Sequence, residues 1–448
     1  MHGQQILTHQ CQNMFRGKLN IIVLLLVSAN TYSADIMDIY DRSLKFNADL
    51  QIISNEHRIS EEIYNQTSSS IFPDINITAN TQEVNVNKYT GSGSQKDYDT
   101  ENASLTITQP LLRLYFFDEL NKAKSIIRKS EVNLEEYKKD LIIKSAELYF
   151  SLINAKNKLI AAEIKSDFSS VQYESAKKLF NNGYVSNIEL SKYKNTYDLA
   201  EVEEQILTNE LDMLKQDVYI FTGKEILEIH NLDHMIDLPL VSYETDSVIA
   251  KAMVSFDSIK SALLDVNISK NEMRSNQSKY YPTVDLTATY DYSDITSGSR
   301  LGKSTRESNT VGLTVNFPIY QGGYQKSKVS EARYKYKNAK INLDLLRRTV
   351  KKDILDSVNN HSLLKKLVIV KRDSYNDTNE SYITLLKGSE SGLYTDVEIK
   401  IAEYDLVKSK NELIETTLEY LLVDLKLKKY TSNLSVKNIQ TINKMLVW

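Results

Sequence analysis

A tandem repeat with an offset of 209 residues constrains the fold more than any other feature of this sequence. Its anchors are rare or clustered residue types, and the paired positions are Pro73 and Pro282, Pro110 and Pro318 (208 apart), Gly183 and Gly392, and Thr222 and Thr431. The flanking residues also match, since PDINITAN in the first half aligns with PTVDLTAT in the second. The chain is therefore a duplication, and both halves are expected to fold alike.

Each half contains a long stretch without glycine or proline, the residues that most often end helices. There are 72 such residues between Pro110 and Gly183, and 64 between Gly323 and Gly388. A helix through most of either stretch would extend on the order of 100 Å. In the first stretch, leucine and alanine recur every seven positions, at Leu141, Leu148, Ala155 and Ala162. This pattern predicts packed rods or a tube rather than compact domains.

Two segments in each half alternate apolar and polar residues, which is the pattern of strands. They predict β-hairpins over 73–110 and 282–318, each with a polar loop in the middle. About ten alternating residues suffice to cross a bilayer when the strand is tilted. An ordinary soluble hairpin packed on a helix would show the same alternation. If the strands span a membrane, four of them cannot close a barrel, so several chains must combine their strands.

The N-terminus has the layout of a secretory signal peptide over residues 1–33. Arg16 and Lys18 precede an apolar run from Ile21 to Val27, and cleavage is expected after Ser33 or Ala34. Residues 1–13 are interpreted as an upstream extension, with Met14 as an alternative start. The first repeat is then 34–239, with a helix near 36–70 and a turn near 183. The second is 240–448, with a helix near 245–279 and a turn near 392.

Composition and motifs exclude several classes of function. The net charge is −4 and no basic stripe indicates nucleic-acid binding. The sequence has no P-loop, no G-x-G-x-x-G and no H-E-x-x-H motif, so no enzyme and no cofactor is predicted. His230 and His234 have the spacing of metal ligands on a helix, but they lie in the link between the repeats, and no metal site is predicted. Cys11 is the single cysteine and precedes the apolar run.

At this point the chain resembles the TolC-like outer-membrane efflux protein family over nearly all of its mature length. The residues that carry the resemblance are the strand segments PTVDLTATYDYS and LTVNFPIYQGG and the two turns, 179–200 and 387–410. In the turns, Gly183 and Gly392 are each followed by a hydroxyl residue and then by an acid beside an aliphatic residue, Glu189-Leu190 and Glu398-Ile399.

The resemblance implies an α+β membrane protein that works as a homotrimer. Each chain would supply four transmembrane strands, a third of a 12-stranded barrel in the outer-membrane lipid, and long antiparallel helices that form an α-barrel through the periplasm. A periplasmic adaptor protein and an inner-membrane transporter would dock at the helical tip. The implied function is the exit duct of a tripartite efflux or type I secretion system, located in the bacterial outer membrane. The alternative from another class is a structural or adhesive coiled-coil envelope protein.

The resemblance also places site residues at the tip. Glu398, Asp396 and Glu189 are the expected pore-constriction and gating residues. The expected adaptor-docking turns consist of Gly183, Tyr184, Val185 and Ser186 in the first repeat, and Gly392, Leu393, Tyr394 and Thr395 in the second. Two positions depart from the family pattern: Ile401 stands where a second acid is usual, and Tyr394 where an arginine is usual. The lock between Glu189 and a basic residue is therefore either absent or remade by Lys387 or Lys400.

Overall fold

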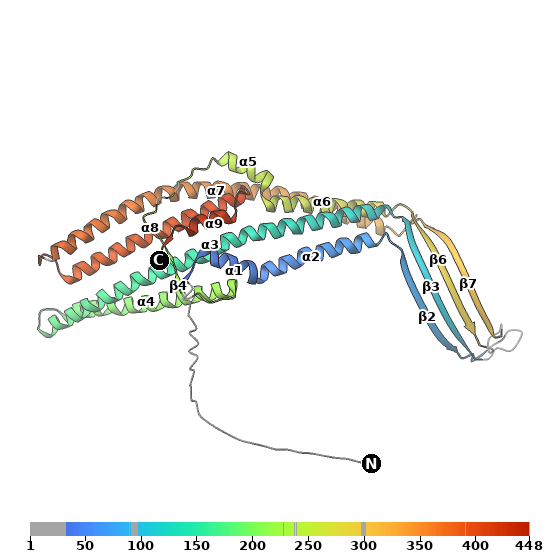
Figure 1. Ribbon diagram of the computed structural model, residues 1–448, viewed down its shortest axis with the longest axis horizontal. Helices are drawn as coiled ribbons and strands as arrows, with labels where there is room; N and C mark the ends of the chain where they lie inside the picture. Colours follow the sequence, from blue (N-terminus) through green and yellow to red (C-terminus); the bar gives the residue numbers. More distant parts are fainter. Residues whose placement is uncertain are drawn as a thin grey trace, which may run out of the picture.

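The computed structural model describes residues 33–447, apart from 89, 91–96, 227, 237, 239, 297–301 and 390. The expected signal peptide lies outside the described residues except for Ser33. The molecule is elongated, with a sheet at one end and the turns of two long helical hairpins at the other (Figure 1).

The two halves of the chain form the same series of elements. The first half contains α1 (Ile36–Phe46), α2 (Ala48–Ser69), β2 (Asp74–Val84), β3 (Tyr98–Leu112), α3 (Leu114–Asn181) and α4 (Asn187–Thr222). The second half contains α5 (Thr245–Ser255), α6 (Asp257–Ser278), β6 (Thr283–Ile295), β7 (Ser304–Asn316), α7 (Tyr324–Ser389) and α8 (Asp396–Tyr430). Corresponding helices have nearly equal lengths, for example 68 residues in α3 and 66 in α7.

The first helix of each repeat is broken where the sequence suggests one continuous helix. The breaks fall at Asn47 and Phe256, which are repeat counterparts, and both residues have extended backbone. Asn47 begins α2 because its side chain accepts a hydrogen bond from the Leu50 amide at 2.9 Å. Phe256 offers no such cap, but its ring is buried and lies 5.1 Å from that of Tyr430. Burial of that ring fixes the second bend.

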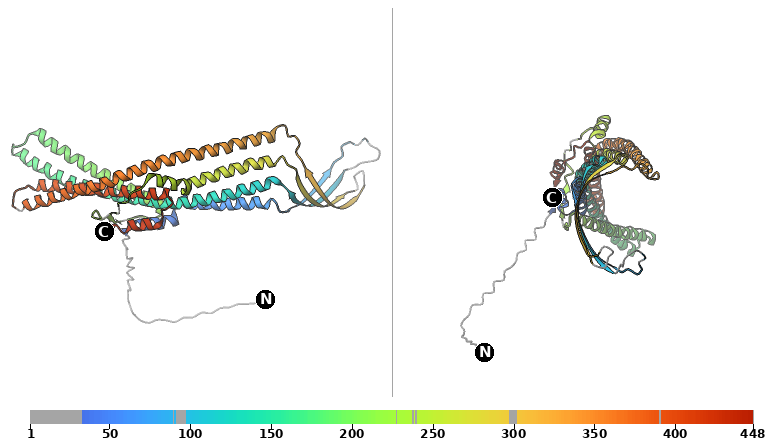
Figure 2. Two further views of the ribbon diagram at one scale, coloured as in Figure 1. Left: turned by 90° about the horizontal axis from the view of Figure 1, so that it is seen from above. Right: turned by 90° about the vertical axis from the view of Figure 1, so that its right-hand side faces the viewer.

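The four long strands form one antiparallel sheet in the order β2-β3-β6-β7. The two hairpins are joined through β3 and β6, where Leu105 lies opposite Tyr290 and Thr106 opposite Thr289. The sheet therefore continues across the repeat boundary and ends on both sides in an unpaired strand, β2 and β7. It is bent into an arc when viewed along the long axis (Figure 2).

The helices form a wall that continues from the sheet. α3 lies between α2 and α6 near the sheet, and between α4 and α8 farther from it. α7 packs on α6 and then on α8. One side of the wall is therefore formed by α7 along its whole length. The other side is formed by α2 near the sheet and by α4 farther from it. The sheet ends in the same order, with β7 on the side of α7 and β2 on the side of α2.

The main hydrophobic core lies midway along the wall, where α3 and α8 cross the short elements. Among its fully buried side chains are Leu141, Leu152, Leu413 and Ile439. Ile439 belongs to α9 (Val436–Asn443), which is not among the elements predicted from the sequence. The same holds for two small pairings, β1 (Ser33–Ala34) with β4 (Glu228–Ile229) and β5 (Asn231–Leu232) with β8 (Leu446–Val447). These elements attach the first and last described residues and the inter-repeat link to the long helices.

Candidate functional site

The first helical turn joins α3 to α4 through a glycine in the left-handed conformation. Gly183 has φ +79°, and its amide donates to the Phe180 carbonyl at 2.9 Å. The Tyr184 amide donates to the Leu179 carbonyl at 2.9 Å. These two bonds define a Schellman motif, which satisfies the last carbonyls of α3. The turn is thus a tight, defined structure, and it leaves the Tyr184 side chain 80% exposed.

The second helical turn joins α7 to α8 with the same hydrogen-bond pattern. Gly392 has φ +72°, and its amide donates to the Ser389 carbonyl at 2.8 Å. The Leu393 amide donates to the Gly388 carbonyl at 3.1 Å, and the Leu393 side chain is 73% exposed. Because the two turns correspond residue by residue, the duplication extends to their backbone geometry.

The acids that follow the turns lie in the first turns of α4 and α8. Ser186 caps α4 by accepting from the Glu189 amide at 3.2 Å. Thr395 and Glu398 form a full capping box at α8: the Glu398 carboxylate accepts from the Thr395 amide at 2.8 Å and from its hydroxyl at 2.9 Å. The bond from the Thr395 amide, and to a smaller extent the bond from its hydroxyl, hold the pKa of Glu398 below its ordinary value. Asp396 is exposed at the start of α8, where the helix dipole favours a negative charge.

Tyr394 packs across the second turn in a way that the first turn does not repeat. A Cβ atom placed on Gly388 would lie 2.5 Å from Cε2 of the Tyr394 ring. The corresponding residues of the first turn are Leu179 and Val185. A large residue and a small residue have therefore changed places between the repeats, and the tyrosine ring occupies the space that the glycine leaves open.

The two turns lie at the same end of the molecule but apart from each other (Figures 1 and 2). Farther back, Lys400 of α8 pairs with Asp167 of α3 at 3.3 Å and with Glu403 at 3.3 Å. Nearby, the rings of Phe168 and Tyr404 approach to 5.8 Å. Glu189 makes no ion pair within the described residues. In this structure Lys400 therefore joins the two hairpins through Asp167, and Glu189 takes no part in that contact.

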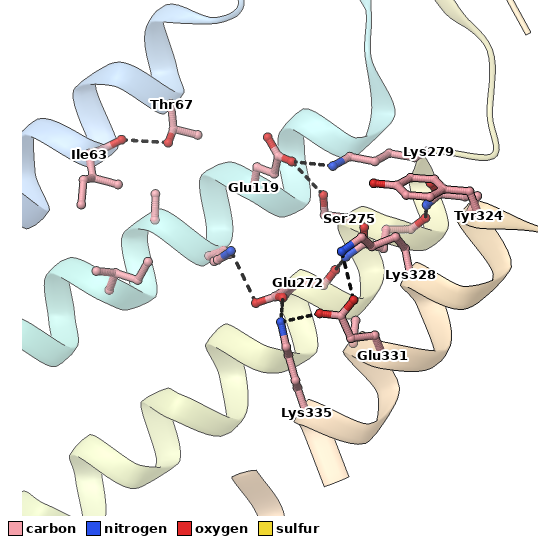
Figure 3. Close-up of a pocket in the computed structure, with 16 residues that line it drawn as sticks. Ile63, Thr67, Glu119, Glu272, Ser275, Lys279, Tyr324, Lys328, Glu331 and Lys335 are labelled. Carbon is pink, nitrogen blue, oxygen red and sulfur yellow. Dashed lines mark hydrogen bonds and ion pairs between the residues drawn. The ribbon is translucent and has the colours of Figure 1, made fainter. Parts of the chain in front are cut away.

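A cavity of about 530 Å³ lies at the other end of the helical wall, between α2, α3, α6 and α7 (Figure 3). Charged side chains bridge it. Glu272 of α6 pairs with Lys122 of α3 at 3.5 Å and with Lys335 of α7 at 3.2 Å. Glu331 pairs with both Lys335 and Lys328 at 3.0 Å. Acids and lysines neutralise one another here, so the cluster ties three helices together.

Neither a metal centre nor a membrane-crossing helix appears in the part of the chain that the structure describes. Within it, no three metal-ligating side chains come together, and His234 contacts the Tyr375 hydroxyl at 3.0 Å. No described helix is both long enough and apolar enough to span a membrane.

Two contacts near the tip were not predicted from the sequence. The contact of Gly388 with Tyr394 depends on the path of the chain through the turn, although the mismatch between Leu179 and Gly388 in the repeat alignment marks the position. The pairing of Lys400 with Asp167 could not be found, because it depends on how the two hairpins pack.

Comparison with known proteins places both halves in one family. The profile of the outer membrane efflux protein family matches residues 39–220 and 248–432. The chain is 23% identical to the outer membrane protein TolC of Escherichia coli (strain K12) over 439 residues, which cover 94% of this chain and 86% of TolC. It is 20% identical to the proteases secretion protein PrtF of Dickeya chrysanthemi, with 97% of this chain and 95% of PrtF covered.

Solved structures share the fold at low sequence identity. The outer membrane channel CmeC of Campylobacter jejuni superposes with a TM-score of 0.72 at 16% identity, covering 92% of this chain and 90% of CmeC. The outer membrane protein VceC of Vibrio cholerae gives a TM-score of 0.69 at 14% identity, covering 88% and 95%. Since the family profile matches most of both repeats, this chain belongs to the outer membrane efflux protein family and is an outer-membrane efflux or secretion channel.

Proposed function

We propose that the chain is the passive exit duct of a tripartite efflux or type I secretion system. Three copies form one continuous tube, with the strands in the outer membrane and the helices in the periplasm. The observation that carries this proposal is the open wall of the single chain. Sheet and helices form one curved layer, and both its sides end in exposed elements.

The two unpaired strands carry exposed apolar side chains, as expected for strands that face lipid. On β2, Ile75 and Ile77 are 62% and 79% exposed, and on β7, Leu313 and Val315 are 67% and 63% exposed. The four strands have 11 to 15 residues, enough to cross a bilayer at a tilt. In lipid, an open strand edge leaves N–H and C=O groups without partners, so β7 of one copy must pair with β2 of the next.

The internal repeat indicates how neighbouring copies align. If the contact between copies repeats the contact between the two halves, β7 takes the role of β3 and β2 of the next copy takes that of β6. Leu105 lies opposite Tyr290 within the chain. Their repeat counterparts are Leu313 and Thr81. Leu313 is therefore placed opposite Thr81 of the neighbouring copy, and the strands are antiparallel as elsewhere in the sheet.

The helices follow the same rule. Within the chain, Lys158 of α3 pairs with Glu415 of α8 at 3.2 Å. Their counterparts at the open sides of the wall are Leu367 of α7 and Ile206 of α4. These residues are 41% and 59% exposed in the single chain. A charged pair inside the chain is thus matched by an apolar pair between chains, which suits a contact buried on assembly.

The helical tips are the proposed gate and docking surface. Asp396, Glu398 and Glu189 follow the two turns at the end of the wall farthest from the sheet. In a closed ring each acid would occur three times around a narrow axis, where it raises the negative potential and favours cations. The exposed Tyr184 and Leu393 offer apolar contacts to a periplasmic adaptor, through which an inner-membrane transporter would engage the duct.

Reconstitution of the purified protein in planar lipid bilayers tests this function. We expect discrete conductance steps that favour cations, from a particle with the mass of three chains. Glu398→Ala removes the carboxylate from the proposed constriction and should reduce cation selectivity and block by divalent cations. Ile188→Ala, which changes an 85% exposed residue in the first turn of α4 without altering charge, serves as the control. A monomeric protein without conductance would contradict the proposal.

A further inference from the structure

A second cavity lies where β7 passes into α7, at the junction of sheet and helices. It has a volume of about 190 Å³ and is open to solvent. Its lining comes from the β7–α7 connection and from the end of α6, and includes Tyr280, Ile319, Tyr320, Lys279 and Lys326. The cavity therefore lies inside the second hairpin, between the chain entering β6 and the chain leaving β7. It does not lie at the open edge of the sheet.

The rim of this cavity is strongly apolar and exposed. Ile319 and Tyr320 are 87% and 85% exposed, and Tyr280 is 44% exposed. Tyrosine rings favour the boundary between lipid and water because one end is apolar and the other polar. Given the proposed function, these side chains lie at the periplasmic surface of the outer membrane.

The cavity is also cationic. Two lysines and no acid contribute to its lining. Lys279 shares its ammonium with Glu119, 3.3 Å away (Figure 3). Lys326 is exposed and makes no ion pair within the described residues. An uncompensated ammonium beside exposed tyrosines at this level has the charge and surroundings to hold a lipid phosphate.

The equivalent cavity of the first repeat is also apolar, but it has no lysine, although the fold around it is the same. That cavity, at the β3–α3 junction, has a volume of about 70 Å³. Ser70 stands at the position of Lys279, and Phe117 at that of Lys326. The one cation in its lining, Arg113, is already paired with Asp285 at 3.0 Å. The fold of the repeat therefore does not by itself require a cationic pocket, because only the second repeat has one.

We infer that the cavity at the β7–α7 junction binds an anionic phospholipid, with Lys326 on the headgroup phosphate and Ile319 and Tyr320 against the start of the acyl chains. Lys279 adds a second, weaker attraction because it is shared with Glu119. The site would fix the second hairpin at a defined depth in the membrane. This inference rests on the proposed function, because it requires the junction to lie at the bilayer surface.

Native mass spectrometry of the purified full-length channel in detergent, titrated with dioleoyl phosphatidylglycerol, tests the inference. Lys326→Gln should weaken binding about fivefold, and the additional Lys279→Gln should weaken it further, as expected for single lysines at an anionic lipid surface. Lys351→Gln removes the same charge from α7 about 37 Å away and should leave binding unchanged. Phosphatidylcholine should bind more weakly than phosphatidylglycerol.

Three outcomes would overturn the lipid site. Equal phosphatidylglycerol binding by the Lys326→Gln and parent proteins would show that the cavity is not involved. Competition by inorganic phosphate at equal concentration would indicate a site for free anions. Lipid binding by single chains but not by the assembled trimer would show that another copy covers the cavity. Single-channel conductance of the same variants reports separately on the proposed function, so a conducting channel without lipid preference sinks only this inference.

Discussion

The carboxylate of Glu398 lies 2.8 Å from the amide nitrogen of Thr395 and closes a capping box at the start of α8. The residue expected to line the constriction is therefore also the residue that ends the second turn. The charge of Glu398 is proposed to affect ion selectivity, whereas its hydrogen bonds stabilise the start of α8. Substitutions can separate these two effects.

Glu398→Gln keeps an oxygen that can accept from the Thr395 amide but removes the charge. We expect it to change ion selectivity while the first turn of α8 stays protected in hydrogen exchange. Glu398→Ala loses both the charge and the cap, so the amides of that turn should exchange faster as well. Equal exchange in the two variants would contradict the structural role of the cap.

The capping box should also respond to acid. Hydrogen bonds from Thr395 lower the pKa of Glu398 in the folded chain. Their stabilising effect is present above the ordinary glutamate pKa of about 4.5 and is lost as the pH falls through the lower, folded value. Amide exchange at the start of α8, corrected for its intrinsic pH dependence, should therefore show protection that decreases below about pH 4.5 in the parent but not in Glu398→Gln.

Gly388 and Tyr394 form the second testable contact at the tip. Gly388→Ala would place a Cβ atom 2.5 Å from the tyrosine ring, so the ring must move. We expect this change to destabilise the turn locally by about 1 kcal/mol, the low end of the cost of overpacking, because the tyrosine lies at the surface and its ring can move. Tyr394→Val introduces the residue of the first turn and should relieve most of that cost in the double variant. Exchange protection around residue 392 measures both, and additive losses in the double variant would refute the contact.

His361 gives a pH dependence in the helical core, away from the tip. It is 2% exposed, its ring lies 4.6 Å from that of Tyr420, and its Nε2 is 3.9 Å from the Asp424 carboxylate. Burial lowers its pKa, and the charges of Lys365 and Lys428 oppose the attraction of Asp424. The Tyr243 hydroxyl occupies the same carboxylate at 2.5 Å.

The folded chain therefore binds fewer protons at His361 than the unfolded chain does. Its contribution to stability is present above the ordinary histidine pKa of 6.5 and decreases as the pH falls through the lower, folded value. His361→Phe keeps the ring contacts and should reduce the fall in Tm between about pH 7.5 and about pH 5.5. An unchanged fall in Tm would exclude His361 as its source.

The repeat and the class of the fold could be predicted because they depend on rare residues. Proline and glycine recur at one offset, and Gly183 and Gly392 both adopt the positive φ that glycine tolerates best. Long segments without either residue leave the helix as the simplest structure. Two halves of mixed helix and sheet follow from these observations alone.

Other features depend on contacts that no local pattern reveals. Phe256 ends α5 because its ring is buried against Tyr430, and phenylalanine carries no signal for a helix end. Asparagine is a good helix cap, so Asn47 could indicate the start of a new helix. The helical pattern on both sides of it favoured one continuous helix instead. Two-residue strands such as β5 are too short for alternation to indicate them. The Tyr394 ring on Gly388 and the pairing of Lys400 with Asp167 arise from tertiary packing.

In the proposed assembly, three open walls close into one tube with the register of the internal repeat. Thr81→Cys and Leu313→Cys, combined in one chain with Cys11→Ser, test it most directly. Directly opposed residues have Cα atoms about 4.5–5.5 Å apart, within the range of a disulfide. Within one chain β2 and β7 are three strand spacings apart, about 14 Å, so only a neighbouring copy can complete the bond.

The control replaces Thr81→Cys by Ile77→Cys, which moves the thiol about 13 Å along the same strand. After mild oxidation of outer membranes, denaturing gels should show a covalent trimer for the Thr81 and Leu313 pair that reductant converts to monomer. The control should remain monomeric. A monomer from both variants, or equal cross-linking in both, would contradict the closed tube or its register.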